Sequence, residues 1–411
     1  MGSGPELVAA DDAAIAAASK AIGSAQGDSQ VIAHLRAGAA DLAARLPLPQ
    51  PHRERPWKYL DVTGMRFAGY APRPGRSSTT VTGAGPGTTV SDFAGATGAT
   101  LATIEKHLSM SVPVARSKFT ALHYALLSEG VLVEAAPNTE TAAPIRIVRE
   151  YREGGQIAAP HTLIVTGANS HVTVIEDYRS SDADILVLPV VEVVPGPNSV
   201  VRYTALHRWG SQTRAFLEQH VVTAPGSEFT GLSVVTGGRV VKSHLRSSLE
   251  GRGSSSELFG LVLGSDKQHV DFYTVQDHIG ADTRSDLLIK AALQDSSRSV
   301  YYGLTRVGLG AKNADANQVN RNLLLSRTAK ADSDPVLEIL TNDVIRVSHG
   351  ATAGPVDEEQ LFYLQARGLT RVDAEALLVR AFLGQVLDRM PDEGLRAELE
   401  ATIEERLAVA G

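Results

Sequence analysis

The chain has 411 residues, a formal net charge of -7 and 43% hydrophobic residues, which allows two or three domains with a sizeable core. The acidic balance argues against a nucleic-acid-binding protein, since such proteins carry a basic face, and no apolar run reaches the roughly 20 residues of a membrane span. There is no cysteine, which excludes disulfides, a thiol nucleophile and a self-sufficient Cys-ligated zinc or iron–sulfur site. The first residues lack a signal-peptide pattern, so we expect a cytoplasmic protein.

The first part of the chain, residues 1–70, is predicted to be helical. Between residues 29 and 46 the apolar side chains recur every three or four positions, the spacing of one helix face. Closely spaced prolines end this helix, and an aromatic segment, Trp57-Lys58-Tyr59, follows. The first half of residues 71–121 is rich in Gly, Pro, Ser and Thr, which indicates a linker and an irregular crossing segment.

From residue 122 to residue 350 the helical spacing disappears, and short β-branched runs alternate with polar turns. The turns recur at intervals of about 15 residues, or twice that, over most of this region. A constant period favours a stack of β coils of about 30 residues each over the alternative, a large antiparallel sandwich with less regular turns. The sequence therefore predicts a mainly β protein with a β-solenoid core, whose open ends are capped by helices.

Helices return in residues 351–411. Asp357 with Gln360 resembles a capping pair, and Gly368 fits the position just after the helix between them. Two more helices are predicted to start near Thr370 and Asp392. These elements predict a small helical domain after the β-solenoid.

Histidines are the remaining candidates for soft metal ligands in a chain without cysteine. His269, Asp271 and Asp277 share one strand parity, which allows a metal-binding face with His278 near by. A solvated polar face is the favoured interpretation of that segment. Four isolated histidines are predicted to be packed or hydrogen-bonded: His161, His171, His207 and His220.

His349 lies where the β region ends, in the run Ser348-His-Gly-Ala-Thr-Ala-Gly354. The small residues after it would let a partner or ligand approach the backbone closely. A neutral imidazole at this place could bind iron or another transition metal. The alternative is structural: the ring would bond a backbone carbonyl and fix the junction between the solenoid and the helices.

Several common catalytic motifs are absent from the sequence. It contains no Walker A pattern, no G-x-S-x-G elbow and no H-E-x-x-H pair, so we do not expect a P-loop ATPase, a serine hydrolase or a zincin. Two other classes stay open at this point. A carbohydrate-active β-solenoid would need clustered acidic side chains on one face, and a purely structural solenoid would need no site.

The run around His349 resembles the S-H-G-A-T-x-G motif of the SufB/SufD family of iron–sulfur cluster assembly proteins. The segment 357–368 resembles that family's L-D-E-x-x-L-F-Y-L-x-S-R-G run, and Trp57-Lys58-Tyr59 resembles the W-K-Y element of SufD. SufD is the better match, because SufB carries a cysteine near the place of residues 320–322 here; SufB without its thiol is the alternative. Many SufD sequences also have cysteine where Val347 stands, so a possible sulfur ligand is missing.

This resemblance implies a right-handed parallel β-helix flanked by N-terminal and C-terminal helical regions. It implies a non-catalytic scaffold subunit that pairs with a SufB-like subunit, or with a second copy as a homodimer, and docks a SufC-like ABC-type ATPase. The chain alone would hold no cofactor stably. A transient iron–sulfur cluster would form in complex with SufB, with His349 as the candidate ligand to transient iron.

The ATPase is expected to dock on the helix that begins near Asp357. Four consecutive apolar residues cover all sides of this helix, which is more apolar surface than a small bundle needs. An aromatic docking face is one explanation, and burial of both aromatic rings in the bundle core is the other. The candidate partner-binding residues are Leu361, Phe362, Tyr363, Leu364 and Arg367.

Overall fold

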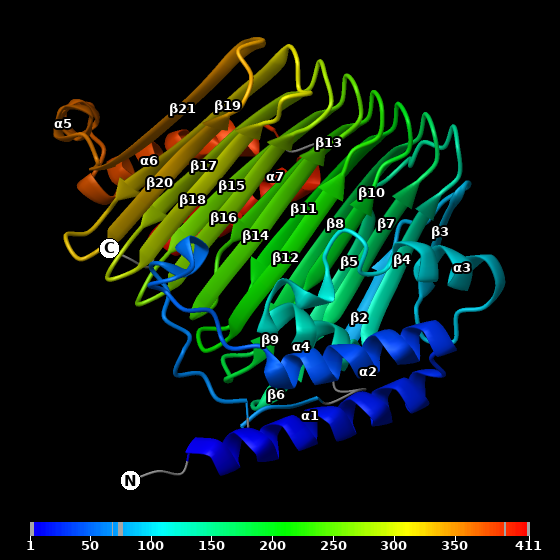
Figure 1. Cartoon of the computed structure of the whole chain (residues 1–411). Helices are drawn as coiled ribbons and strands as arrows, with labels where there is room; N and C mark the ends of the chain where they lie inside the picture. The colour runs from blue at the N-terminus through cyan, green and yellow to red at the C-terminus, as the bar shows by residue number, and fades with distance from the viewer. Residues whose placement is uncertain (1–3, 68, 73–76, 390–391, 409–411) are drawn as a thin grey trace.

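The computed structural model describes residues 4–67, 69–72, 77–389 and 392–408. It is a β-solenoid with helical regions at both ends, as the sequence predicts (Figure 1). Two long parallel sheets form the walls of the solenoid, and the chain passes from one sheet to the other in each coil.

Sheet A and sheet B contain alternate strands of the chain. In spatial order, sheet A contains β3 (Thr88–Asp92), β4 (Glu129–Ala135), β7 (Pro160–Thr166), β10 (Val190–Val194), β12 (Arg214–Val222), β14 (Val240–Leu249), β16 (His269–His278), β18 (Arg298–Val307) and β20 (Lys330–Ile339). Beside this row lie β1 (Ala71–Pro72), β6 (Gln156–Ala158) and β9 (Leu186–Val187). Sheet B contains β2 (Ser77–Thr82), β5 (Ile145–Tyr151), β8 (His171–Ser180), β11 (Val200–Arg208), β13 (Glu228–Val235), β15 (Ser255–Gly264), β17 (Arg284–Leu293), β19 (Ala314–Leu324) and β21 (Val344–Pro355).

The strand register confirms the coil length of about 30 residues. Ser255 pairs with Arg284, and Arg284 pairs in turn with Asp315 on the next strand of sheet B. From β4 and β5 onward the ladders of both sheets are parallel, so the antiparallel sandwich is wrong. Most strands are covered on both faces, so their burial shows no simple alternation. Several of them still carry buried polar residues, such as Lys242 on β14 and Asp271 on β16.

One turn of each coil needs a residue with positive φ, and asparagine supplies it repeatedly. Asn138, Asn169 and Asn198 have φ angles of 58°, 56° and 55°. The amide of Asn169 donates to Asn138 at 3.1 Å, and that of Asn198 donates to Asn169 at 3.4 Å. Asparagine adopts this left-handed conformation more easily than most residues because its side chain bonds locally. This ladder explains the regular turn period of the sequence.

The N-terminal region covers the outer face of sheet A. Ser29 caps α2, because its side chain accepts a hydrogen bond from the backbone N–H of Ile32. The buried residues of α2 recur at helical spacing, which confirms the helix predicted between residues 29 and 46. The helices of this region are α1 (Gly4–Gln26), α2 (Gln30–Arg45), η1 (Arg55–Trp57), α3 (Gly98–His107), η2 (Val114–Arg116) and α4 (Lys118–Leu126).

The segment 71–121, expected to be a linker and crossing segment, contains more regular structure than the sequence indicates. Strands β2 and β3 pair antiparallel with β5 and β4 and close the first coil. The glycines between them mark a turn: Gly83 has a φ of 88°, and a Cβ atom there would lie 2.2 Å from the carbonyl oxygen of Pro144. These glycines therefore belong to a tight turn between β2 and β3 and not to a linker.

The C-terminal helices are α5 (Glu358–Ala366), α6 (Arg371–Leu387) and α7 (Glu393–Ala408). The predicted caps are present, since Asp357 accepts from two backbone N–H groups and Gly368 has a φ of 97°. Apolar residues of α6 and α7 pack with Phe259 and Leu261 of β15. In Figure 1 these two helices lie behind the solenoid, opposite α2 and α4.

Candidate functional site

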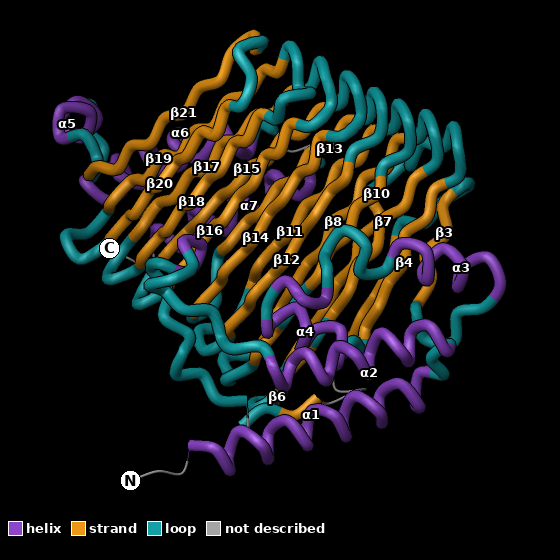
Figure 2. Tube along the Cα trace, in the orientation of Figure 1, coloured by secondary structure: helices purple, strands orange, loops and turns teal. Residues whose placement is uncertain are grey.

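The solenoid is open at its C-terminal end. β20 is the last strand of sheet A and β21 the last strand of sheet B, and in the described ranges each pairs with a strand on one side alone. Figure 2 shows these two strands at the edge of the stack, with α5 projecting beyond β21. An unpaired strand edge presents backbone N–H and C=O groups that another chain can pair with.

His349 lies at the mouth of this open end. It is in register with Gln318 of β19, so the two side chains face the same side of sheet B. Gln318 is buried and accepts a hydrogen bond of 2.8 Å from the hydroxyl of Tyr301 inside the solenoid. His349 itself is exposed, and its ring makes no hydrogen bond to any residue of the described segments. Its imidazole is therefore open to a partner.

Two asparagines occupy the place where a cysteine of SufB is expected. Asn320 and Asn322 are both buried, and the amide of Asn322 donates to Asn320 Oδ1 at 2.7 Å. Ser333 also donates to Asn320 Oδ1, and Asn322 Nδ2 lies 3.3 Å from the carbonyl oxygen of Thr352. This cluster is internally satisfied. The one sequence signal for this cluster is the polar residue at every second position of β19: Gln318, Asn320 and Asn322.

Exposed apolar side chains gather at one corner of the last coils. Ile279, Leu309 and Leu340 lie in the turns that follow β16, β18 and β20, while Ile339 ends β20 and Ile345 lies near the start of β21. The backbone N–H of Ile279 donates to the carbonyl oxygen of Leu249, and that of Leu340 donates to the carbonyl oxygen of Val307. Such a cluster beside an open strand edge is typical of an interaction surface. Its residues are Ile279, Leu309, Ile339, Leu340 and Ile345.

The aromatic residues of α5 point away from the protein. Phe362 is 74% exposed and Tyr363 57% exposed, so the interpretation that both rings are core is wrong. Arg367 donates to the hydroxyl of Tyr363 at 2.9 Å and lies 5.0 Å from its ring centroid. Leu361 is 1% exposed and packs with Val356, so it attaches α5 to the protein instead of offering a surface. Leu364 is half-buried beside it.

The isolated histidines behave largely as predicted. His161 and His220 are buried and hydrogen-bonded, and His207 accepts a hydrogen bond from the indole of Trp209. Burial lowers the pKa of His207 to about 3 and that of His220 to about 4. His171 is different: it is exposed, so the prediction of a packed ring is wrong there.

The segment 269–278 forms neither a metal site nor a solvated face. Asp271 is buried and lies 2.7 Å from the ammonium group of Lys242, while Asp277 faces Arg246 at 3.4 Å. His278 is buried between hydroxyl groups. Within the described residues no three His, Asp or Glu side chains converge as a metal site.

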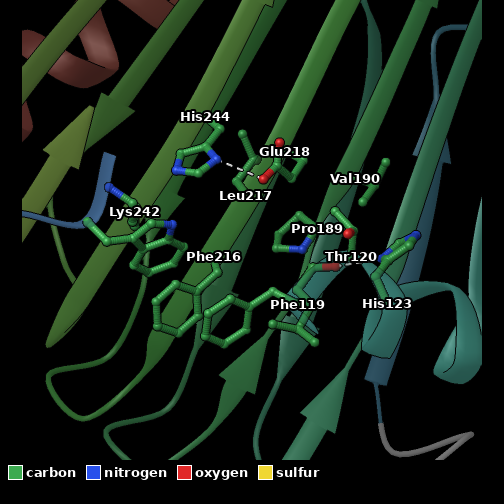
Figure 3. Close-up of a pocket in the computed structure, with 12 residues that line it drawn as sticks. Phe119, Thr120, His123, Pro189, Val190, Phe216, Leu217, Glu218, Lys242 and His244 are labelled. Atoms are coloured by element: carbon green, nitrogen blue, oxygen red, sulfur yellow. Dashed lines mark hydrogen bonds and ion pairs between the residues drawn. The ribbon is translucent and has the colours of Figure 1, made fainter. Parts of the chain in front are cut away.

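A small cavity lies between the N-terminal region and sheet A (Figure 3). Trp57 and Phe119 cover it, and Glu218 accepts a hydrogen bond of 2.8 Å from His244 on its floor. Burial alone would raise the pKa of Glu218, but its contacts with His244 and the positive charge of Arg116 outweigh this effect, and the pKa is lowered. The free space is about 10 Å³, enough for one water molecule and too small for a substrate.

Comparison with known proteins identifies the family. Residues 149–382, more than half of the chain, match the family model described as the SufBD core domain of the SUF system for iron–sulfur cluster assembly. The chain belongs to the SufB/SufD family. The match begins in β5 and ends in α6, so it spans the solenoid and the open end.

The most informative relatives of this SufB/SufD family member are SufD proteins. The chain is 29% identical over 310 residues to the iron–sulfur cluster assembly protein SufD of Bacillus subtilis, covering 74% of this chain and 70% of that protein. It is 30% identical over 248 residues to SufD of Escherichia coli, covering 60% and 58%. It is 28% identical over 299 residues to a SufBD family protein of Mycobacterium leprae, covering 71% and 76%. These matches confirm the resemblance to SufD. Separately, no helix of the described ranges has the length and hydropathy of a membrane span.

Proposed function

We propose that this chain is a SufD-like, non-catalytic scaffold subunit that pairs with a SufB-like subunit at the open end of its solenoid. The observation that carries the proposal is the open end itself: two unpaired strand edges, an exposed apolar corner and the unpartnered ring of His349 lie together there. A second copy of the chain is the competing occupant of the same surface.

In this proposal His349 acts on a nascent iron–sulfur cluster held mainly by the partner. A neutral imidazole can ligate iron or donate a hydrogen bond to a sulfur ligand, and the ring of His349 is accessible for either role. The chain has no thiolate, so a cluster would not stay on it alone. The cluster is cargo that the complex builds and transfers.

The proposed docking site for a SufC-like ABC-type ATPase is the outer face of α5. Exposed aromatic side chains and arginine are the residue types that dominate binding energy at interfaces. Phe362, Tyr363 and Arg367 present such a group on a helix that the rest of the bundle leaves uncovered. Nucleotide hydrolysis would then belong to the partner, in keeping with the absence of a Walker A pattern.

Co-purification tests this proposal. The full chain is mixed with a SufB-like and a SufC-like protein of one bacterium, and the complexes are separated by size and weighed by light scattering. A heteromeric complex containing all three chains is expected. A chain that stays a homodimer in the presence of both proteins would contradict the pairing.

A further inference from the structure

One segment of the N-terminal region leaves the helices and crosses the outer face of sheet A. We call residues 47–60, between α2 and the return toward β1, the strap. Figure 1 shows it in dark blue, running from α2 toward β16 and β20. It contains η1 and the Trp57-Lys58-Tyr59 segment.

The strap is anchored to the outer face of sheet A at Pro56 and Trp57. Trp57 is buried, stacks on Phe119 with ring centroids 5.4 Å apart, and lies 6.0 Å from the ring centroid of Phe216. The ammonium group of Lys242 donates to the carbonyl oxygen of Pro56 and lies 4.8 Å from the Trp57 ring. These contacts fix the backbone of the strap over β12 and β14.

The tip of the strap reaches the last coil. Lys58 Nζ donates to Asp334 on β20 at 3.0 Å, and the hydroxyl of Tyr59 donates to the same carboxylate oxygen at 3.2 Å. The guanidinium of Arg298 on β18 lies 5.2 Å from the Tyr59 ring. Lys58 is half-exposed, so its ion pair alone is weak. Because Trp57 already holds the backbone in place, little further entropy is lost when the tip binds β20.

We propose that Lys58 and Tyr59 are positioning residues that keep β20 ordered for the subunit that pairs with the open end. β20 pairs with β18 on one side, and an edge strand tied on one side opens more easily than its neighbours. The strap adds a second tie that spans from the covered centre of sheet A to its edge. The claim that the partner needs an ordered β20 rests on the proposed function. The claim that the strap keeps β20 ordered is independent of it.

The test uses the full chain with Lys58→Met and Tyr59→Phe, which removes the hydrogen bonds to Asp334 and keeps most of the side-chain volume. Amide hydrogen exchange is measured by mass spectrometry in residues 330–339 and in residues 240–249. Exchange in 330–339 is expected to become about fivefold faster, while that in 240–249 and the melting temperature stay unchanged. The matched control is Arg252→Met, which breaks an exposed ion pair with Asp282 at a distant turn.

A charge exchange provides the rescue. Lys58→Asp combined with Asp334→Lys should restore slow exchange, while either change alone should not. Unchanged exchange of 330–339 in the first variant would overturn the role of the strap. Faster exchange with unaltered affinity for the SufB-like partner would show that the partner does not need an ordered β20, and would overturn the positioning role of Lys58 and Tyr59. If the wild-type chain binds no such partner, that result counts against the proposed function alone.

Discussion

The buried pair of Lys242 and Asp271 allows a stability prediction with a defined magnitude. The two groups lie 2.7 Å apart with 1% of each side chain exposed, and neither oxygen of Asp271 makes another hydrogen bond in the described structure. At this separation Coulomb's law gives roughly 6 kcal/mol of attraction for an effective dielectric constant of about 20. The attraction offsets the desolvation of two ions. Asp271→Leu should therefore lower the free energy of unfolding by about 3–5 kcal/mol, because it leaves an uncompensated ammonium group in the interior.

Replacing both partners separates the charge effect from loss of packing. The double variant Lys242→Met, Asp271→Leu removes both charges and also the bond to Pro56, and its unfolding free energy should return to within about 2 kcal/mol of the original. Urea unfolding at pH 7, followed by circular dichroism, measures all variants. A double variant as unstable as Asp271→Leu would refute the reasoning, since packing and not charge would then dominate.

Acidification should weaken the same pair. Burial raises the pKa of Asp271, but the charge of Lys242 outweighs it and the net pKa is lowered. A carboxyl group with a lowered pKa stabilises the folded state above its unfolded pKa of about 3.9, and this contribution is lost as the pH falls further. As the pH drops below about 4, the free energy of unfolding of the original chain should therefore fall relative to that of the double variant, which has no carboxyl group at this position.

Three further predictions concern other parts of the molecule. Phe362→Ala and Tyr363→Ala should each weaken the binding of a SufC-like ATPase at least tenfold without changing the melting temperature. The control Met110→Ala, at a similarly exposed apolar residue, should change neither quantity. Weaker binding that only follows a lower melting temperature would count against docking at α5. Asn169→Ala should lower the free energy of unfolding by about 1–2 kcal/mol and Asn169→Gly by less, because of the positive φ at this turn; equal losses in urea titrations would show that φ is not the cause. The isolated chain, incubated anaerobically with iron and sulfide and then desalted, should retain no visible chromophore, and stoichiometric bound iron would disprove this.

The solenoid was predictable because its turns carry local signals. The asparagines at 138, 169 and 198 are placed by the φ angle that each turn needs, so their spacing in the sequence reports the coil directly. The caps at Asp357 and Gly368 are equally local. Strands β2 and β3 were missed because their pairing with β5 and β4 is a tertiary contact that leaves no periodic trace in a Gly-rich segment.

The site was predictable in part. The position of His349 at the end of the β region follows from the order of elements, but its open ring depends on the register with Gln318, which no local pattern encodes. The exposure of Phe362 and the burial of Leu361 are set by the docking of α5 on Val356. The contact of Lys58 with Asp334 joins residues far apart in the chain. The sequence therefore shows the Trp57-Lys58-Tyr59 motif but does not show that it lies against β20.

The most direct test of the central claim is cluster formation by a complex that carries His349→Asn. The three purified chains are combined, cysteine desulfurase and iron are supplied anaerobically, and the cluster is followed by its visible absorbance and by iron content per complex. His171→Asn is the matched control, since that histidine is also exposed but lies on β8, far from the open end. The proposal predicts that both variants assemble normally and that His349→Asn alone loses most of the cluster yield. A wild-type yield from an intact His349→Asn complex would contradict it.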